Sequence, residues 1–142
     1  MRDNHASVQR SFRLSRRTIE LLDAAAAAGR ETRNALVDRL LGEALRLERH
    51  PLIRFHEGAS GRRQPLVVGT RLYVHQLIAT VRASDSDVDE AATYLAVDSR
   101  LVRAAVEYYA EFTDEVDDDA AVTSRIEFDE RARWERQQRA LA

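Results

Sequence analysis

The stretch that decides the N-terminal fold reads VQRSFRL, residues 8–14. Its side chains can lie on two sides of an extended chain, with Val8, Phe12 and Leu14 on one side and Gln9, Ser11 and Arg13 on the other. This partial period-two alternation is typical of a half-buried β-strand. No partner strand is predicted nearby, so the simplest partner is the same strand of a second copy. A two-stranded ribbon of this kind fits the major groove of DNA.

A first helix is predicted over residues 16–28, directly after this strand. Ser15 is a good N-cap residue, because its hydroxyl can accept a hydrogen bond from the first turn. An apolar stripe at helical spacing follows, made of Ile19, Leu22, Ala25 and Ala26. Gly29 stands where a helix favours a left-handed residue at its C-terminal end.

A second helix is predicted from Thr32, its expected N-cap, to about Leu47. Its apolar stripe is broad and contains Leu36, Val37, Leu40, Leu41, Ala44 and Leu45. One strand and two helices of about 40 residues cannot bury so wide a stripe by themselves. Dimerisation of this region is therefore expected.

The order of polar–apolar strand, capped helix, glycine turn and second helix resembles a ribbon-helix-helix domain of the CopG/MetJ/Arc type. Arg10 departs from that pattern, where an apolar residue would be usual. The resemblance implies a homodimer that binds operator DNA through Gln9, Ser11 and Arg13; the alternative is an ordinary solvated strand face. Three further residues, Thr32, Arg33 and Asn34, begin the second helix. Free amides and the dipole attract phosphate there, although the three could also serve only as a cap.

The middle of the chain, residues 51–113, is predicted to form a small second domain. Pro51 interrupts the helical pattern, and residues 51–64 read as a boundary region. Two apolar runs, residues 65–68 and 72–74, flank the sequence Gly69-Thr70-Arg71 and predict a hairpin or tight strand connection. Three helices follow at about 75–83, 87–95 and 99–112, with Ser86 or Asp87 capping the second and Asp98 the third.

The run Pro65-Leu66-Val67-Val68-Gly69-Thr70-Arg71-Leu72-Tyr73-Val74 resembles the P-x-x-x-G-T-R-x-x-V signature of a small helix-turn-helix family often found in antitoxins. The run Gly61-Arg62-Arg63-Gln64 before it is longer than the family's usual one. Direct DNA reading by the last helix is not favoured. Its arginines, Arg100 and Arg103, are offset by acidic neighbours, so a structural or self-association role is expected instead.

The C-terminal part, residues 114–142, is predicted to be an acidic linker followed by an arm. The run Asp117-Asp118-Asp119 marks the solvated linker, and residues 124–142 have too few apolar side chains for a core of their own. The arm is either a frayed amphipathic helix or a segment that folds on a toxin. In the second case its contact residues are Phe128, Arg131, Arg133, Trp134 and Arg136, with Trp134 as the aromatic anchor and one arginine pairing with acidic groups of the toxin.

Composition excludes several kinds of chemistry. There is no cysteine, which removes disulfides, thiolate metal sites and thiol nucleophiles. All 22 basic residues are arginine, which removes Schiff-base lysines and Walker-type phosphate loops. The histidines lack metal-ligand spacing, and His50, His56 and His75 are expected in loops or on the surface. We therefore expect no cofactor, no metal and no enzymatic activity.

Charge is distributed unevenly along the 142 residues. The net charge is +5 over residues 1–63, −3 over 64–113 and −4 over 114–142. A polyanion partner is therefore expected at the N-terminal end only. No apolar run approaches the roughly 20 residues that span a bilayer, and no signal-peptide pattern is present. A cytoplasmic protein with no membrane partner is the expectation.

Together the sequence predicts a mainly α fold with short strands. Residues 1–50 would form a dimeric ribbon-helix-helix domain, 51–113 a β-hairpin and three-helix domain of helix-turn-helix type, and 114–142 a linker with a helical or disordered arm. This order resembles a VapB-like type II antitoxin. The resemblance implies that the chain neutralises a PIN-like ribonuclease toxin and represses its own operon. The alternatives are a stand-alone ribbon-helix-helix repressor without a toxin and a nuclease that uses the acidic clusters.

Overall fold

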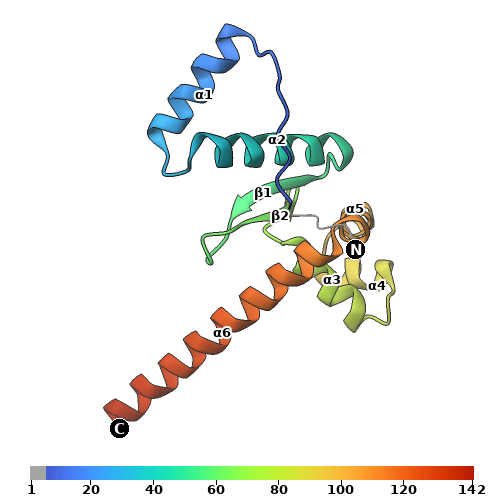
Figure 1. Ribbon diagram of the computed structural model, residues 1–142. Coiled ribbons are helices and arrows are strands. Elements are labelled where there is room, and N and C mark those ends of the chain that lie inside the picture. Colours follow the sequence, from blue (N-terminus) through green and yellow to red (C-terminus); the bar gives the residue numbers. More distant parts are fainter. Residues whose placement is uncertain (1–5) are drawn as a thin grey trace. The chain divides into compact units, whose positions relative to one another are not determined.

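The computed structural model describes residues 6–142, which form six helices and one two-stranded antiparallel sheet (Figure 1). This confirms the expected mainly helical fold with short strands. The chain divides into two compact units, Met1–Gly42 and Glu43–Ala142, and the boundary falls within helix α2. We call them the N-terminal unit and the C-terminal unit and describe each by itself.

Helices α1, Arg16–Ala28, and α2, Arg33–Arg49, follow their predicted ranges closely. Both begin at the expected caps, because the Ser15 hydroxyl accepts from the Thr18 N–H at 3.2 Å and the Thr32 hydroxyl accepts from the Ala35 N–H at 3.2 Å. The prediction for Gly29 is wrong. Its backbone is extended, with φ −99° and ψ 177°, so the first helix ends without a left-handed residue.

Residues 6–15 belong to no helix or strand in the single chain. A strand needs a hydrogen-bonded neighbour, and the only sheet in the described part of this chain is formed elsewhere, by β1 and β2. The stretch 8–14 therefore forms no strand within one copy. Its pairing with a second copy stays a prediction.

The hairpin of the C-terminal unit is formed by β1, Ile53–Glu57, and β2, Arg63–Val67, in antiparallel register with Phe55 opposite Pro65. The connection predicted between residues 65–68 and 72–74 is a tight turn with one antiparallel bridge, and the hairpin itself pairs β2 with β1 instead. The sequence IRFHE of β1 alternates as a strand should, although it lies inside the boundary region that the sequence predicts over residues 51–64. Its inner residue Ile53 is completely buried.

Residues 72–74 are too short to form the second strand of a hairpin. A tight turn brings them back beside β2. Within this turn the Thr70 hydroxyl donates to the Val67 carbonyl at 2.9 Å and accepts from the Leu72 N–H at 3.0 Å. Gly69 has φ +75°, which favours glycine there. One isolated bridge, Leu66 to Tyr73, forms before helix α3 begins at Val74.

Three helices follow close to their predicted positions: α3, Val74–Ala83; α4, Val88–Leu95; and α5, Ser99–Glu111. The carboxylate of Asp87 accepts from the Asp89 and Glu90 N–H groups at 2.9 and 3.0 Å, and that of Asp98 accepts from the Arg100 N–H at 2.8 Å. Local capping thus explains why the sequence predicts these starts well.

The core of the C-terminal unit lies between the hairpin, α3, α5 and the beginning of α6. Its largest fully buried side chains are Ile53, Val67, Val74, Leu77, Val102 and Tyr108. Burial of these residues supplies the main stabilisation of the unit. Tyr108 packs against the ring of Phe112 at 4.7 Å between ring centroids, as expected for a core residue.

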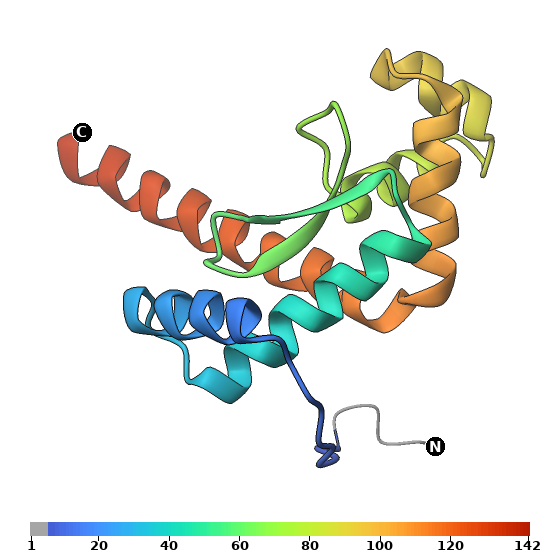
Figure 2. The same cartoon turned by 90° about the horizontal axis from the view of Figure 1, so that it is seen from above.

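Helix α6 runs without interruption over Thr113–Leu141 and extends well past the other helices of its unit in both views (Figures 1 and 2). The predicted linker at Asp117-Asp118-Asp119 is therefore wrong. Asp119 is only 5% exposed, and Arg62 pairs with it at 3.3 Å. Burial raises the pKa of Asp119 to about 6, and the Arg62 guanidinium opposes that rise. The acidic run is part of a packed helix, because its charges have partners.

Ion pairs hold the end of α2 within the C-terminal unit. The Arg46 guanidinium donates to both oxygens of Glu115 at 2.5 and 2.7 Å and lies 4.5 Å from the centroid of the Phe112 ring. Arg63 pairs with Glu43 in the same way. Grouped by unit, the net charge is +3 for residues 1–42 and −5 for residues 43–142. The positive charge predicted for residues 1–63 is thus divided between the two units, with +3 in residues 1–42 and +2 in residues 43–63.

Candidate nucleic-acid interface and partner-binding arm

The three predicted base-contacting residues, Gln9, Ser11 and Arg13, are all exposed. Within the described residues their side chains make no hydrogen bond or ion pair. Arg10, on the other side of the predicted strand, donates only to the backbone carbonyl of Gln9 at 3.2 Å. Arginine side chains that lack a protein carboxylate can bind phosphate or guanine without breaking an existing ion pair.

The residues at the start of α2 have different environments. The Thr32 hydroxyl is used as the N-cap. Arg33 pairs with Asp23 at 2.8 Å, which reduces the charge that it can offer to phosphate. Asn34 is exposed. The helix N-terminus itself still presents its dipole to an anion.

The N-terminal unit leaves most of its large apolar side chains in contact with solvent. Only Leu36 is buried, at 5% exposure, whereas Phe12 is 75% and Leu41 49% exposed. The other exposed apolar side chains of this unit are Val8, Leu14, Ile19, Leu21, Val37 and Leu40. We call Phe12, Leu40 and Leu41, together with these neighbours, the apolar face of the N-terminal unit. So many exposed large apolar side chains in one small unit favour an interaction surface.

Helix α5 does not offer a basic surface. Arg100 pairs with its own cap residue Asp98 at 3.3 Å, and Arg103 pairs with Asp89 at 3.3 Å. Tyr108, near the end of α5, is only 1% exposed and belongs to the core. This agrees with the structural role that the sequence favours for the helix.

The five predicted toxin-contacting residues, Phe128, Arg131, Arg133, Trp134 and Arg136, are all exposed on the distal part of α6. Phe128 is 73% and Trp134 60% exposed. With about 100° of rotation per residue, Trp134 lies about 120° around the helix from Phe128, and Arg136 about 80° from Phe128 in the other direction. The five side chains are therefore spread around most of the helix and do not form a single face.

His50 and His75 are only partly exposed. His50 packs its ring against Tyr108 and Phe112, and its Nε2 lies 2.8 Å from an oxygen of Glu111. His75 stands in the first turn of α3 and is half-buried, and this burial lowers its pKa. The expectation of a loop or surface position agrees with His50, which follows the end of α2, and with the exposed His56, but it is wrong for His75, which is half-buried in a helix.

Two searches of the described part of the chain gave negative findings. Residues 6–142 contain no helix that is both long and apolar enough to cross a membrane. The same residues contain no group of three or more histidine, aspartate or glutamate side chains placed to hold a metal ion.

Comparison with known proteins returned no match. No protein-family model, no curated protein and no solved structure matches this chain.

Proposed function

We propose that the N-terminal unit pairs with a second copy and that residues 8–14 of the two copies form an antiparallel ribbon that binds operator DNA. The observation that carries this proposal is the exposed apolar face of the N-terminal unit, in which only Leu36 is buried. A second copy would cover this face and supply the missing strand partner at once. Monomers with so little buried apolar surface are seldom stable by themselves.

Charge supports DNA as the ligand of this ribbon. The N-terminal unit carries a net charge of +3, against −5 for the rest of the chain. Arg10, Arg13 and Arg16 have no ion pair among the described residues, so their charges can interact with phosphate. Positive charge near the ligand supplies much of the affinity of DNA-binding proteins. Gln9, Ser11 and Arg13 would then contact the base edges.

The test replaces Arg13 by alanine and measures binding to the DNA immediately upstream of the coding sequence. We expect affinity to fall by about 1–3 kcal/mol, or roughly 5- to 150-fold, which is the usual worth of a specific base contact. The matched control is Arg10→Ala, which removes the same charge from the other side of the strand and should lower affinity less. Equal losses in both variants, with the dimer intact, would assign the effect to charge alone and reject Arg13 as a base-contacting residue.

We further propose that the chain is a VapB-like type II antitoxin and that the distal part of α6 binds a PIN-like ribonuclease toxin. Two features support this role. The distal helix extends past the rest of its unit (Figure 2), and it exposes Phe128 and Trp134 among charged residues. Aromatic side chains of this kind often anchor protein interfaces. Repression of the shared operon would follow from DNA binding by the N-terminal unit.

Replacing Trp134 by alanine tests the toxin-binding role. We expect the variant to bind the product of the adjacent gene about 2 kcal/mol more weakly, or roughly thirtyfold, because an interface anchor is lost. The control is Leu141→Ala on the same helix, where the removed side chain is 84% exposed. If operator binding is retained but the wild-type chain binds no adjacent gene product, the stand-alone repressor replaces the antitoxin as the favoured function.

A further inference from the structure

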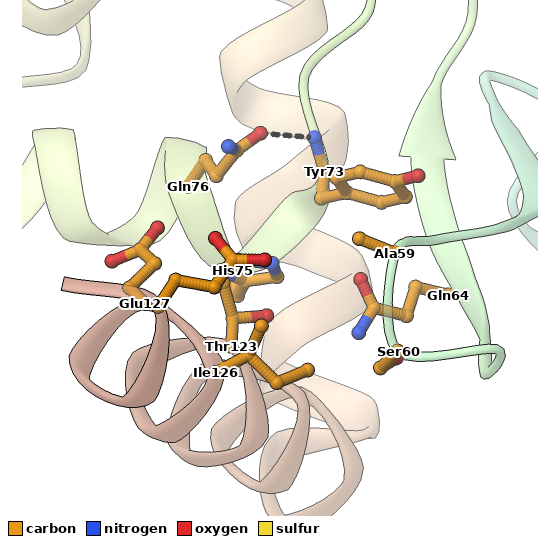
Figure 3. A pocket seen from close by; sticks show the side chains of 10 residues that line it. Ala59, Ser60, Gln64, Tyr73, His75, Gln76, Thr123, Ile126 and Glu127 are labelled. Atoms are coloured by element: carbon orange, nitrogen blue, oxygen red, sulfur yellow. Dashed lines mark hydrogen bonds between the residues drawn. The ribbon is translucent and has the colours of Figure 1, made fainter. Parts of the chain in front are cut away.

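A small hollow lies within the C-terminal unit, between the turn that connects β1 to β2, the start of α3 and the middle of α6 (Figure 3). Its volume is about 220 Å³. We call it the Gln64 pocket, and its chemically important lining residues are Gln64, Tyr73, His75, Glu127 and Glu130. Pockets for drug-sized ligands measure roughly 300–1,000 Å³, so this one suits a group the size of a single side chain.

Gln64 is only 3% exposed as a residue, and its side-chain amide makes no hydrogen bond within the described chain. No fully buried side-chain polar atom of the described residues lacks a partner, so the small exposed part of Gln64 includes its amide. Figure 3 shows this amide pointing into the hollow. A ligand in the hollow can therefore hydrogen-bond to an amide that the chain itself leaves available.

Gly58 keeps space open beside this amide. A Cβ atom added at Gly58 would lie 3.3 Å from Oε1 of Gln64 and 3.4 Å from the hydroxyl oxygen of Tyr73. The Tyr73 hydroxyl is in turn 3.0 Å from Nδ1 of His56. Glycine at this position therefore allows both polar groups to approach the hairpin turn closely.

Two nearly parallel rings stand at the pocket. The rings of Tyr73 and His75 are stacked, with centroids 5.8 Å apart and an angle of 9° between the planes. Burial lowers the pKa of His75, which favours the neutral imidazole at neutral pH. A neutral imidazole does not repel a cation, and the face of the Tyr73 ring attracts one.

The opposite wall is acidic. Glu127 and Glu130 stand three residues apart on α6 and make no ion pair or hydrogen bond within the described residues. Glu127 interacts electrostatically with His75 and opposes the lowering of the His75 pKa by burial without reversing it. No arginine lines the pocket, although the chain contains 22 basic residues, all arginine. The pocket thus offers negative charge that the chain itself does not neutralise.

These features select the class of ligand. Two carboxylates disfavour phosphates and other anions, and an apolar group would leave the Gln64 amide unpaired. A guanidinium ion is planar, donates up to five hydrogen bonds, pairs with a carboxylate through two of them and stacks on aromatic rings. We propose that the Gln64 pocket binds a guanidinium group, presented by an arginine side chain of a protein partner. Neither the proposed DNA contacts nor the proposed anchor Trp134 uses this pocket.

Each group would have a distinct role in that complex. Glu127 would accept two hydrogen bonds from the guanidinium, Oε1 of Gln64 would accept a third, and the Tyr73 ring would cover the planar face. A lysine ammonium ion can satisfy the carboxylates, but it cannot pair through two parallel bonds or stack through a planar face. Binding should therefore distinguish arginine from lysine as well as from neutral citrulline, whose side chain has nearly the same shape.

The test follows the side-chain amide signal of Gln64 and the ring signals of Tyr73 and His75 by NMR during titration of the full chain. The ligand is Nα-acetyl-arginine amide, and the corresponding lysine and citrulline amides serve as comparisons. We expect the arginine compound to shift these signals with a dissociation constant on the order of 1 mM. The citrulline compound should cause no saturable shift, and the lysine compound should bind more weakly.

Two variants complete the test. Glu127 is exposed, so Glu127→Gln should leave the fold intact while weakening binding of the arginine compound about fivefold or more, because a charge-assisted pair is lost. Glu135→Gln removes an exposed carboxylate of the same helix outside the pocket and should have no effect. Equal binding of arginine and citrulline, equal effects of the two variants, or no saturable shift with arginine would each overturn the proposal.

Discussion

Replacing Leu41 by aspartate should convert the proposed dimer to a monomer that does not bind the proposed operator DNA. Leu41 belongs to the apolar face of the N-terminal unit and is 49% exposed in the single chain. A two-fold dimer would bury this position in both copies, so the substitution places two unpaired carboxylates in an apolar interface. The desolvation cost should exceed about 4 kcal/mol, which raises the dimer dissociation constant at least roughly a thousandfold.

Sedimentation equilibrium over a range of concentrations measures this change, and a gel-shift experiment measures DNA binding in parallel. The control is Leu141→Asp, the same substitution at a position that is 84% exposed at the end of α6. That variant should keep the wild-type oligomeric state. A Leu41→Asp chain that still dimerises and binds DNA would show that another surface joins the two copies.

Replacing Leu77 by alanine should lower the free energy of unfolding of the C-terminal unit by about 2–5 kcal/mol. Leu77 lies in α3 and is completely buried in the core with Ile53, Val74 and Val102. Alanine would remove the apolar contacts of three carbon atoms and leave a cavity, because the strands and helices around it can close the space only in part.

Denaturant unfolding followed by circular dichroism tests this prediction. Leu141→Ala removes the same atoms from an exposed position and should change the free energy of unfolding by less than about 0.5 kcal/mol. If Leu77→Ala is too unstable to purify, Leu77→Met should fold and cost less than about 1.5 kcal/mol, because it nearly conserves volume. A loss below 1 kcal/mol for the alanine variant would contradict the central position of Leu77.

The helices were predictable because their signals are local. Ser15, Thr32, Asp87 and Asp98 each accept a hydrogen bond from a backbone N–H two or three residues later, as their positions in the sequence suggest. Such bonds depend on neighbouring residues only. The ranges of α1 to α5 follow from them and from apolar spacing, with errors of one or two residues at the ends.

The hairpin was predicted at the wrong place because strand pairing is not local. The run at 65–68 overlaps β2, whose main partner is β1 on the N-terminal side, whereas the run at 72–74 contributes only the Leu66–Tyr73 bridge. Pairing of residues 65–68 with β1 and pairing with residues 72–74 both satisfy the alternation of apolar side chains. Only the packing of Ile53 into the core, together with the early start of α3 at Val74, distinguishes them.

The candidate sites likewise differ in whether they are formed by residues close together or far apart in the sequence. Gln9, Arg13, Phe128 and Trp134 are exposed, and their roles as contact residues stay predictions. The Gln64 pocket could not be predicted. Its walls come from residues 58–76 and from α6, and no spacing in the sequence connects Gln64 with Glu127.

By itself the sequence determined the helix starts, the mainly helical composition and the excess of positive charge at the N-terminal end, because capping, apolar periodicity and charge are properties of neighbouring residues. Only the tertiary structure decided which strand β1 pairs with, that Asp117-Asp118-Asp119 is helical, and which polar groups line a pocket. The acidic run lies in a packed helix because Arg62, which is distant in the sequence, pairs with Asp118 and Asp119. Val116, next to this run, is buried in the core. The stretch 8–14 has no such partner among the described residues of one chain, and for that reason we propose a second copy as the partner of its predicted strand.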